Sequence, residues 1–222
     1  MKTITLQPSA LEDANTQAAI LHERLSRIGI IAVNILGSPG SGKTTFLEAL
    51  VKNSENPESI AVINGDLFTS HDAERLEALH VQAIELNTEG ATRLDAPMIL
   101  KALDDLDLFG IEWLFIENVG DLVTPADYSL GEHLRVLIYS VTEGSDKPSK
   151  YPAAFSTSNI VFINKIDLIP FTNFDLKYCS KGIHAVNPEA FIVPGSASRP
   201  ATLESIWEQM RMKLPEQNQE KE

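Results

Sequence analysis

The chain has 222 residues, 43% of them hydrophobic, which is enough for one large α/β domain with a substantial core. Its formal net charge of −13 argues against nucleic acid or an anionic membrane as a general partner. No apolar stretch approaches the ~20 residues of a membrane span, and from residues 1–6 we expect no secretory signal. A single cysteine, Cys179, excludes an internal disulfide and suits a reducing compartment. We therefore expect a cytoplasmic protein.

The apolar pattern predicts helices and strands that alternate along the chain. The first element is a helix that begins at Ser9, which forms a capping box with Glu12, and its apolar face continues to Ile28. Further helices are predicted from Lys43 and at 72–79, 94–108, 174–185 and 202–214. Strands are predicted at 30–36, 59–63, 81–86, 113–116, 134–141, 160–163 and 190–193. Because several strands are continuously apolar, we expect a single α/β domain with a mainly parallel, doubly wound sheet of about seven strands and ligands at the strands' carboxyl ends.

The strongest motif lies between the strand at 30–36 and the helix that follows it. Residues 37–44, Gly-Ser-Pro-Gly-Ser-Gly-Lys-Thr, match the phosphate-binding loop G-x-x-x-x-G-K-S/T. Backbone N–H groups of such a loop surround phosphate oxygens, and the helix N-terminus adds favourable partial charge. Lys43 is expected to reach the β- and γ-phosphates, and the Thr44 hydroxyl to bind Mg²⁺. The alternative is a Gly/Ser connector without a ligand. The expected contacts are Gly37, Ser38, Pro39, Gly40, Ser41, Gly42, Lys43, Thr44 and Thr45.

Residues 164–167, Asn-Lys-Ile-Asp, directly follow the strand at 160–163 and predict recognition of guanine. Guanine presents N1–H and a 2-amino group on one edge, and one carboxylate can accept from both, whereas adenine offers no such pair. Asp167 is the expected reader, Lys165 can cover the base with its stem, and Asn164 can fix the loop or touch the purine. Alone, the motif also fits an ordinary turn; together with the phosphate loop it favours GTP over ATP. A weaker expectation places Ser196 and Ala197 in a third loop that contacts the base.

Two carboxylates follow predicted strands where groups that respond to the γ-phosphate are expected. Asp66 comes after the strand at 59–63, and Glu117 after the strand at 113–116. Such carboxylates can hold Mg²⁺ through water or orient an attacking water, and Gly120 would allow the loop to reorganise. Ordinary turn chemistry is the alternative. We expect catalysis from Lys43, Asp66 and Glu117, and Mg²⁺ binding by Thr44, Asp66 and Glu117.

From about Gly29 to Met210 the sequence resembles the HypB family, GTPases that assist nickel insertion during maturation of nickel–iron hydrogenases. The nucleotide motifs are shared with many GTPases, and the related urease-maturation GTPases match the more family-specific segments less well. Those segments are Glu117-Asn118-Val119-Gly120 and residues 140–144, Ser-Val-Thr-Glu-Gly, with Asp146-Lys147-Pro148. Further matches are Gly65-Asp66 with residues 72–75, Leu94-Asp95-Ala96, Lys150-Tyr151-Pro152 and residues 164–168.

The resemblance implies a P-loop NTPase of the signal-recognition-particle/MinD (SIMIBI) class that hydrolyses GTP slowly. It further implies a homodimer formed with GTP, and a HypA-like nickel-delivery protein and a nickel-enzyme precursor as partners. The charge and the apolar pattern lead us to expect neither nucleic acid nor membrane as a partner. We accordingly divide the chain into an N-terminal helix packed on the domain (1–28), a GTPase domain (29–214) and a polar tail (215–222). Lys147 could approach the nucleotide or the opposite subunit.

The resemblance also implies a metal site at the dimer interface, formed by a Cys-His pair before Leu-Asp-Ala and a Cys before Pro-Ala. In this sequence those positions are Thr92, Arg93 and Thr124. Threonine hydroxyls are poor ligands for nickel or zinc, and a guanidinium group stays protonated. We therefore expect no nickel or zinc site there. Two hypotheses remain: a maturation GTPase whose partners supply the metal, or a paralogue that uses GTP as an assembly or regulatory signal for another client.

Overall fold

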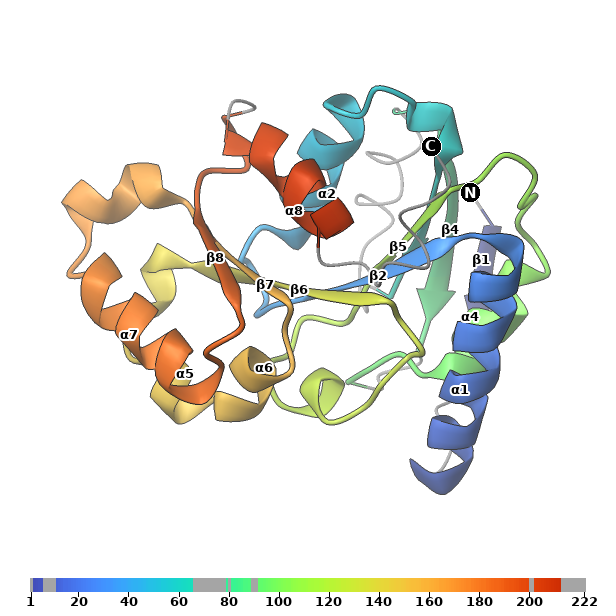
Figure 1. The fold of residues 1–222 in the computed structure, drawn as a ribbon, viewed down its shortest axis with the longest axis horizontal. Coiled ribbons are helices and arrows are strands. Elements are labelled where there is room, and N and C mark those ends of the chain that lie inside the picture. Colours follow the sequence, from blue (N-terminus) through green and yellow to red (C-terminus); the bar gives the residue numbers. More distant parts are fainter. Residues whose placement is uncertain are drawn as a thin grey trace.

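The computed structural model of the protein describes residues 2–5, 11–65, 79, 81–88, 92–199 and 202–212. Within these ranges eight strands form one parallel sheet in the order β1-β4-β3-β5-β2-β6-β7-β8 (Figure 1). The predicted fold class is confirmed. The expectations for Ser9, for Asp66 and for residues 72–78 fall on residues outside the described part. The strands are β1 (Lys2–Thr5), β2 (Ile31–Leu36), β3 (Ile60–Asn64), β4 (Gln82–Asn87), β5 (Trp113–Glu117), β6 (Leu134–Ser140), β7 (Ile160–Asn164) and β8 (Phe191–Pro194).

The sheet contains one more strand than the pattern predicts. Strand β1 pairs in parallel with β4, with Lys2 opposite Ile84 and Thr5 opposite Asn87. Its four residues alternate polar and apolar types, Lys-Thr-Ile-Thr. A segment this short and polar carries too weak a periodic signal to be told from a loop. Its place in the sheet therefore depends on the partner strand.

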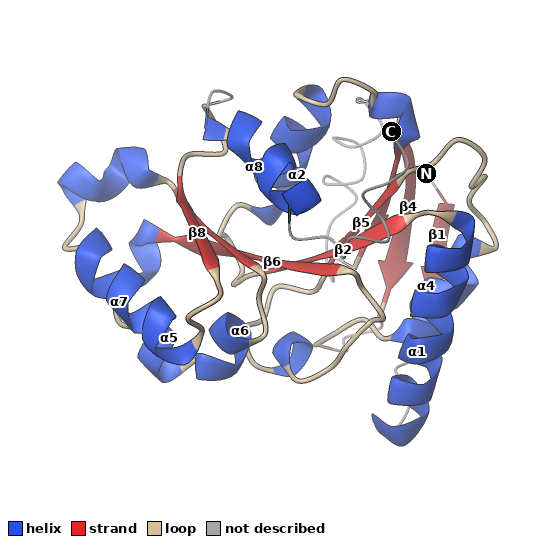
Figure 2. Ribbon diagram, viewed as in Figure 1, coloured by secondary structure: helices blue, strands red, loops and turns tan. Residues whose placement is uncertain are grey.

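Helices cover both faces of the sheet (Figure 2). Helices α2 and α8 pack on one face, and α1, α4, α6 and α7 pack on the other. The central strands β3, β5, β6 and β7 are buried along their whole length, as their continuously apolar sequences predict. None of the described helices is long and apolar enough to cross a membrane. The helices are α1 (Leu11–Ile28), α2 (Lys43–Lys52), α4 (Ala96–Leu103), α5 (Lys147–Lys150), α6 (Pro152–Ser156), α7 (Leu176–Val186) and α8 (Glu204–Met212), with 3-10 turns η1 (Pro57–Ser59), η2 (Thr124–Ala126), η3 (Val141–Glu143) and η4 (Ile166–Phe171).

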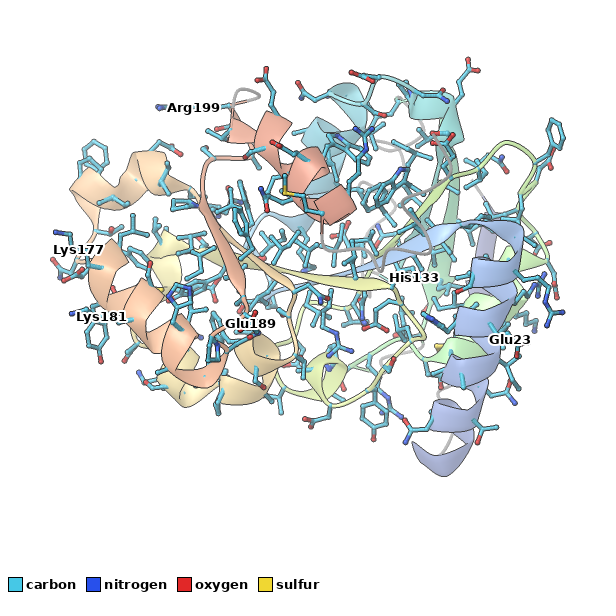
Figure 3. The ribbon with its side chains drawn as sticks, viewed as in Figure 1. Glu23, His133, Lys177, Lys181, Glu189 and Arg199 are labelled. Carbon is cyan, nitrogen blue, oxygen red and sulfur yellow. The ribbon has the colours of Figure 1, made fainter. Side chains whose placement is uncertain are left out.

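Helix α1 is fixed to the domain through His133, which lies just before β6 and beside the helix (Figure 3). The His133 Nδ1 accepts from the Ala32 N–H at 3.0 Å, and its Nε2 lies 2.9 Å from the Ser26 Oγ of α1. Because Nδ1 is an acceptor, the imidazole is neutral and its proton is on Nε2. Burial, reinforced by the neighbouring His22, lowers the pKa of His133 from 6.5 to about 4. A side chain at Gly131 would collide with the backbone of α1, so the helix packs closely here.

Candidate functional site

The phosphate loop connects β2 to α2, at the edge of the sheet where the carboxyl ends of the parallel strands meet. Gly42, directly before α2, has a φ of 98°, in the left-handed region that favours glycine. A side chain there would also collide with the amide of Asn164. The Lys43 Nζ donates to the Gly37 and Ser38 carbonyl oxygens at 3.2 and 3.4 Å, so the ammonium lies over the loop. The predicted loop therefore has the conformation and the buried cation that phosphate binding requires.

The two described residues expected to serve Mg²⁺ lie in direct contact. The Thr44 hydroxyl donates to the Glu117 Oε1 at 2.8 Å, and Glu117 is the buried last residue of β5. The Gly65 N–H, directly after β3, donates to the Glu117 carbonyl oxygen at 2.9 Å, so the end of β3 is held against the end of β5. A hydroxyl and a carboxylate supply the hard oxygen donors that Mg²⁺ prefers. The donor set therefore fits this ion, while the role of Asp66 stays a prediction.

Asn164 ties together the three loops that the sequence assigned to the nucleotide. Its Nδ2 donates to the Ser41 carbonyl oxygen at 2.8 Å. Its Oδ1 accepts from the N–H groups of Lys165 and Ala197 at 2.8 and 2.9 Å. All three of these hydrogen bonds are to backbone groups of the loops. They favour the role of fixing the loops over contact with the purine, which stays a prediction.

The expected guanine reader lies at the start of η4. The Oδ1 of Asp167 is buried and finds no hydrogen-bond partner among the described residues. The Ser196 hydroxyl, which hydrogen-bonds to the carboxylate, holds the pKa of Asp167 below its usual value, against the opposing effect of desolvation. Lys165 has a φ of 61°, and its Nζ donates to the Gly40 carbonyl oxygen at 2.6 Å, so its stem runs from the base loop to the phosphate loop. An ionised carboxylate with one open acceptor fits the donor edge of guanine.

One contact of the phosphate loop was not anticipated from the sequence. The Ser38 hydroxyl donates to the Glu143 Oε2 at 2.6 Å. The other oxygen of Glu143 accepts from the Ser140 N–H at 3.0 Å, and the Lys147 Nζ lies 4.0 Å from Glu143. Ser140 and Glu143 form a capping box at the start of η3, a pattern that the spacing Ser-x-x-Glu could have revealed. Glu143, which belongs to the family-specific segment 140–144, thus contacts the phosphate loop through Ser38.

Of the three positions where the resemblance places metal ligands, Arg93 and Thr124 make other contacts here, and Thr92 is exposed. Arg93 stacks on the Tyr128 ring, with its guanidinium carbon 3.8 Å from the ring centre. Thr124 opens η2, and its N–H donates to the Asp121 Oδ2 at 3.0 Å. Burial raises the pKa of the Cys179 thiol to about 12, so this cysteine is a poor thiolate donor. Among the described residues no group of three or more His, Cys, Asp or Glu side chains is arranged to hold a metal ion.

Comparison with known proteins finds a matching family and similar curated proteins. Residues 31–194 match the family described as CobW/HypB/UreG, nucleotide-binding domain. Hydrogenase maturation factor HypB of Rhizobium leguminosarum bv. viciae is 38% identical over 206 residues, which cover 93% of this chain and 69% of that protein. Its counterpart in Escherichia coli K12 is 40% identical over 197 residues, covering 89% and 68%.

Solved structures agree. The crystal structure of HypB from Helicobacter pylori in complex with nickel matches with a TM-score of 0.85 and 35% identity, covering 92% of this chain and 98% of that one. HypB from Archaeoglobus fulgidus matches with a TM-score of 0.85 and 32% identity, covering 92% and 100%. A LAO/AO transport system kinase, with a TM-score of 0.55 and 17% identity, shares the fold alone.

Proposed function

This chain belongs to the CobW/HypB/UreG family, among its HypB hydrogenase maturation factors, and from that premise we propose that it binds GTP with Mg²⁺ and slowly hydrolyses it to GDP and phosphate. The observation that carries the proposal is the buried Oδ1 of Asp167, which has no hydrogen-bond partner within the described part of the chain and lies in a loop that Asn164 joins to the phosphate loop. A base reader and a phosphate-binding loop held at a fixed separation by one side chain suit a guanine nucleotide.

The phosphate end of the site supplies charge and position rather than a covalent step. Lys43 leaves the carbonyl oxygens of Gly37 and Ser38 for the β- and γ-phosphates, and the loop N–H groups surround the remaining oxygens. Thr44 and Glu117 would hold Mg²⁺, which when bound neutralises phosphate charge. Asp66 is the residue we propose for positioning the attacking water, with Glu117 beside it.

In the cell we propose a cytoplasmic, GTP-controlled homodimer that serves the maturation of a nickel enzyme, with nickel–iron hydrogenase as the first client to test. A HypA-like nickel-delivery protein and the enzyme precursor are the proposed partners. The chemistry of Thr92, Arg93 and Thr124 favours a second candidate, a GTP-dependent assembly or regulatory factor that binds no nickel and serves another client. We retain a division into an N-terminal segment at 1–28, which contains strand β1 as well as the expected helix α1, a GTPase domain at 29–214 and a tail at 215–222.

The nucleotide proposal is tested by changing the hydrogen-bond character of Asp167. Asp167→Asn replaces an acceptor with a donor, which opposes the 2-amino group of guanine but complements the 2-carbonyl of xanthine. Affinity for GTP, measured by calorimetry, should fall by about tenfold or more while affinity for xanthosine triphosphate rises. Asp175→Asn is a matched control: Asp175 caps α7 through the Tyr178 N–H at 2.9 Å, and asparagine caps equally well. Unchanged base selectivity in Asp167→Asn would remove Asp167 from the role of reader.

Hydrolysis and dimerisation need separate measurements. Lys43→Ala should abolish phosphate release, and full turnover in that variant would contradict the phosphate site. Sedimentation in GDP and in a non-hydrolysable GTP analogue tests the dimer, since equal mass in both states would exclude control by the γ-phosphate. Hydrogenase activity of a strain that lacks this gene, grown with and without added nickel, separates the two candidate roles.

A further inference from the structure

Two loops that are far apart in the sequence are joined on the surface by Arg93 and Tyr128. Residues 92–95 lie between β4 and α4, directly before the helix, and residues 118–133 connect β5 to β6. The guanidinium carbon of Arg93 lies 3.8 Å from the centre of the Tyr128 ring. This is well inside the ~6 Å range of a cation–π contact, and both side chains are partly buried, which strengthens such a contact.

A second connection between the same loops runs through the interior. The Asn118 Oδ1 accepts from the Leu94 N–H at 3.1 Å, and its Nδ2 donates to the Asn34 Oδ1 at 3.2 Å. Asn34 in turn donates to the Glu132 Oε1 at 3.1 Å. The side chains of Asn34, Asn118 and Glu132 have little contact with solvent. Breaking one of these hydrogen bonds would therefore leave buried polar groups without a partner.

The buried hydrogen-bond network continues from Glu132 through Arg135 to the backbone of Tyr128. Arg135 and Glu132 form a buried ion pair with a 2.6 Å separation. Arg135 also donates to the carbonyl oxygens of Ala126 and Tyr128 at 3.0 and 2.9 Å. Residues 124–128 are therefore held from inside by Arg135 and from outside by Arg93. The buried Arg135 guanidinium, which donates to several acceptors, has a fixed geometry. The Tyr128 ring on which Arg93 stacks is therefore held in one position.

Residues 117–128 also contact the proposed nucleotide site. Asn118 follows Glu117, whose carboxylate accepts from Thr44. Asp121 forms an isolated antiparallel bridge with Gly37, the first residue of the phosphate loop, and its carboxylate accepts from the Val123 and Thr124 N–H groups at 3.1 and 3.0 Å. Any displacement of residues 121–128 would therefore be passed to the phosphate loop and to Glu117.

We propose that Arg93 is a positioning residue that holds residues 121–128 against the phosphate loop through its stack on Tyr128, without any metal. We call this Arg93–Tyr128 contact the clasp. Arg93 occupies one of the positions where the resemblance implies a metal ligand, and a permanently protonated guanidinium repels a divalent cation. In this chain a cation–π contact therefore orders the loops that follow β4 and β5. That these loops serve GTP turnover rests on the function proposed above; the clasp itself does not.

Hydrogen–deuterium exchange of the full chain without nucleotide tests the clasp independently of GTP. Arg93→Gln and Tyr128→Ala remove it; Tyr128→Phe keeps the ring and Arg93→Lys keeps the charge. Amides in 122–130 should exchange about fivefold faster in the first two variants, at the wild-type rate in Tyr128→Phe and at an intermediate rate in Arg93→Lys. Arg24→Gln is the matched control, because Arg24 has an exposed pair with Asp104 at 3.3 Å. Equal exchange in Arg93→Gln and the wild type would overturn the proposal.

Two further readouts separate positioning from general stability. Arg93→Gln should lower kcat for GTP by about fivefold while KM stays within about twofold of wild type, since Arg93 is expected to act on the loop and not on the nucleotide. In a Ni²⁺ titration of the wild type, the exchange of residues 122–130 should not change. Stoichiometric Ni²⁺ binding that slows exchange in this segment would show a metal-dependent clasp and refute the inference. Absence of GTPase activity in every variant, wild type included, would defeat the proposed function and leave the exchange result intact.

Discussion

Replacing Asn164 with alanine probes whether one side chain holds the nucleotide loops together. Asn164 is buried at the end of β7 and makes three hydrogen bonds to backbone groups of Ser41, Lys165 and Ala197, at 2.8, 2.8 and 2.9 Å. Alanine can make none of them. The variant leaves one carbonyl oxygen and two N–H groups without this partner, and it frees the phosphate loop from the loop after β8.

The expected loss can be estimated from those three bonds. At about 1 kcal/mol each, Asn164→Ala should lower the free energy of unfolding by about 3 kcal/mol, a large fraction of the total for a single domain. In urea, with a slope of roughly 2–3 kcal/mol per molar, the midpoint should shift by about 1 M or slightly more. Affinity for GTP should fall by about tenfold or more, because binding would then have to order the loops.

Asn187→Ala is a matched control for this experiment. Asn187, at the end of α7, donates to the carbonyl oxygens of Phe155, Ser156 and Ser158 at 3.0, 3.3 and 2.9 Å. Its loss should cost a similar amount of stability while the dissociation constant for GTP, measured by calorimetry, stays within about twofold. If Asn164→Ala binds GTP as tightly as the wild type, or if both variants lose affinity equally, the assignment of Asn164 to the loops is wrong.

Three further outcomes follow from contacts in the structure. Thr44→Val removes the hydroxyl that donates a hydrogen bond to Glu117, so the Mg²⁺-dependent rate of phosphate release should drop by about tenfold or more. An unchanged Mg²⁺ dependence would contradict the assignment of Thr44 and Glu117 to Mg²⁺. A double-mutant cycle of Ser38→Ala and Glu143→Gln, read by urea unfolding, should show a coupling of about 1–2 kcal/mol because the 2.6 Å bond is to a carboxylate; additive effects would exclude it. Because the pKa of His133 is lowered from 6.5 to about 4, the folded protein binds fewer protons than the unfolded chain between those values. The contribution of neutral His133 to the free energy of unfolding should therefore be fully present above pH 6.5. It should fall by about 1–2 kcal/mol as the pH drops to about 4, allowing for solvent screening. The same slope in His133→Gln would assign the loss to other groups.

Much of the scaffold could be predicted because its signals are local. A strand buried on both faces needs an unbroken apolar run, as in Val-Phe-Ile of β7, whatever its neighbours are. The phosphate loop is also local, because its glycines permit backbone angles that other residues rarely adopt. Asp167 is predicted as the base reader in the same way, from the chemistry of a four-residue motif. These features depend on residues close together in the chain.

The sequence alone thus determined most of the strands and helices, though not β1, and it predicts which residues meet a guanine nucleotide. Only the tertiary structure decided that Thr44 meets Glu117, that Ser38 meets Glu143 and that Arg93 stacks on Tyr128. The first two contacts join residues 73 and 105 positions apart. The physical reason is the strand order, which places β2 between β5 and β6 and so brings together three loops that no local pattern relates.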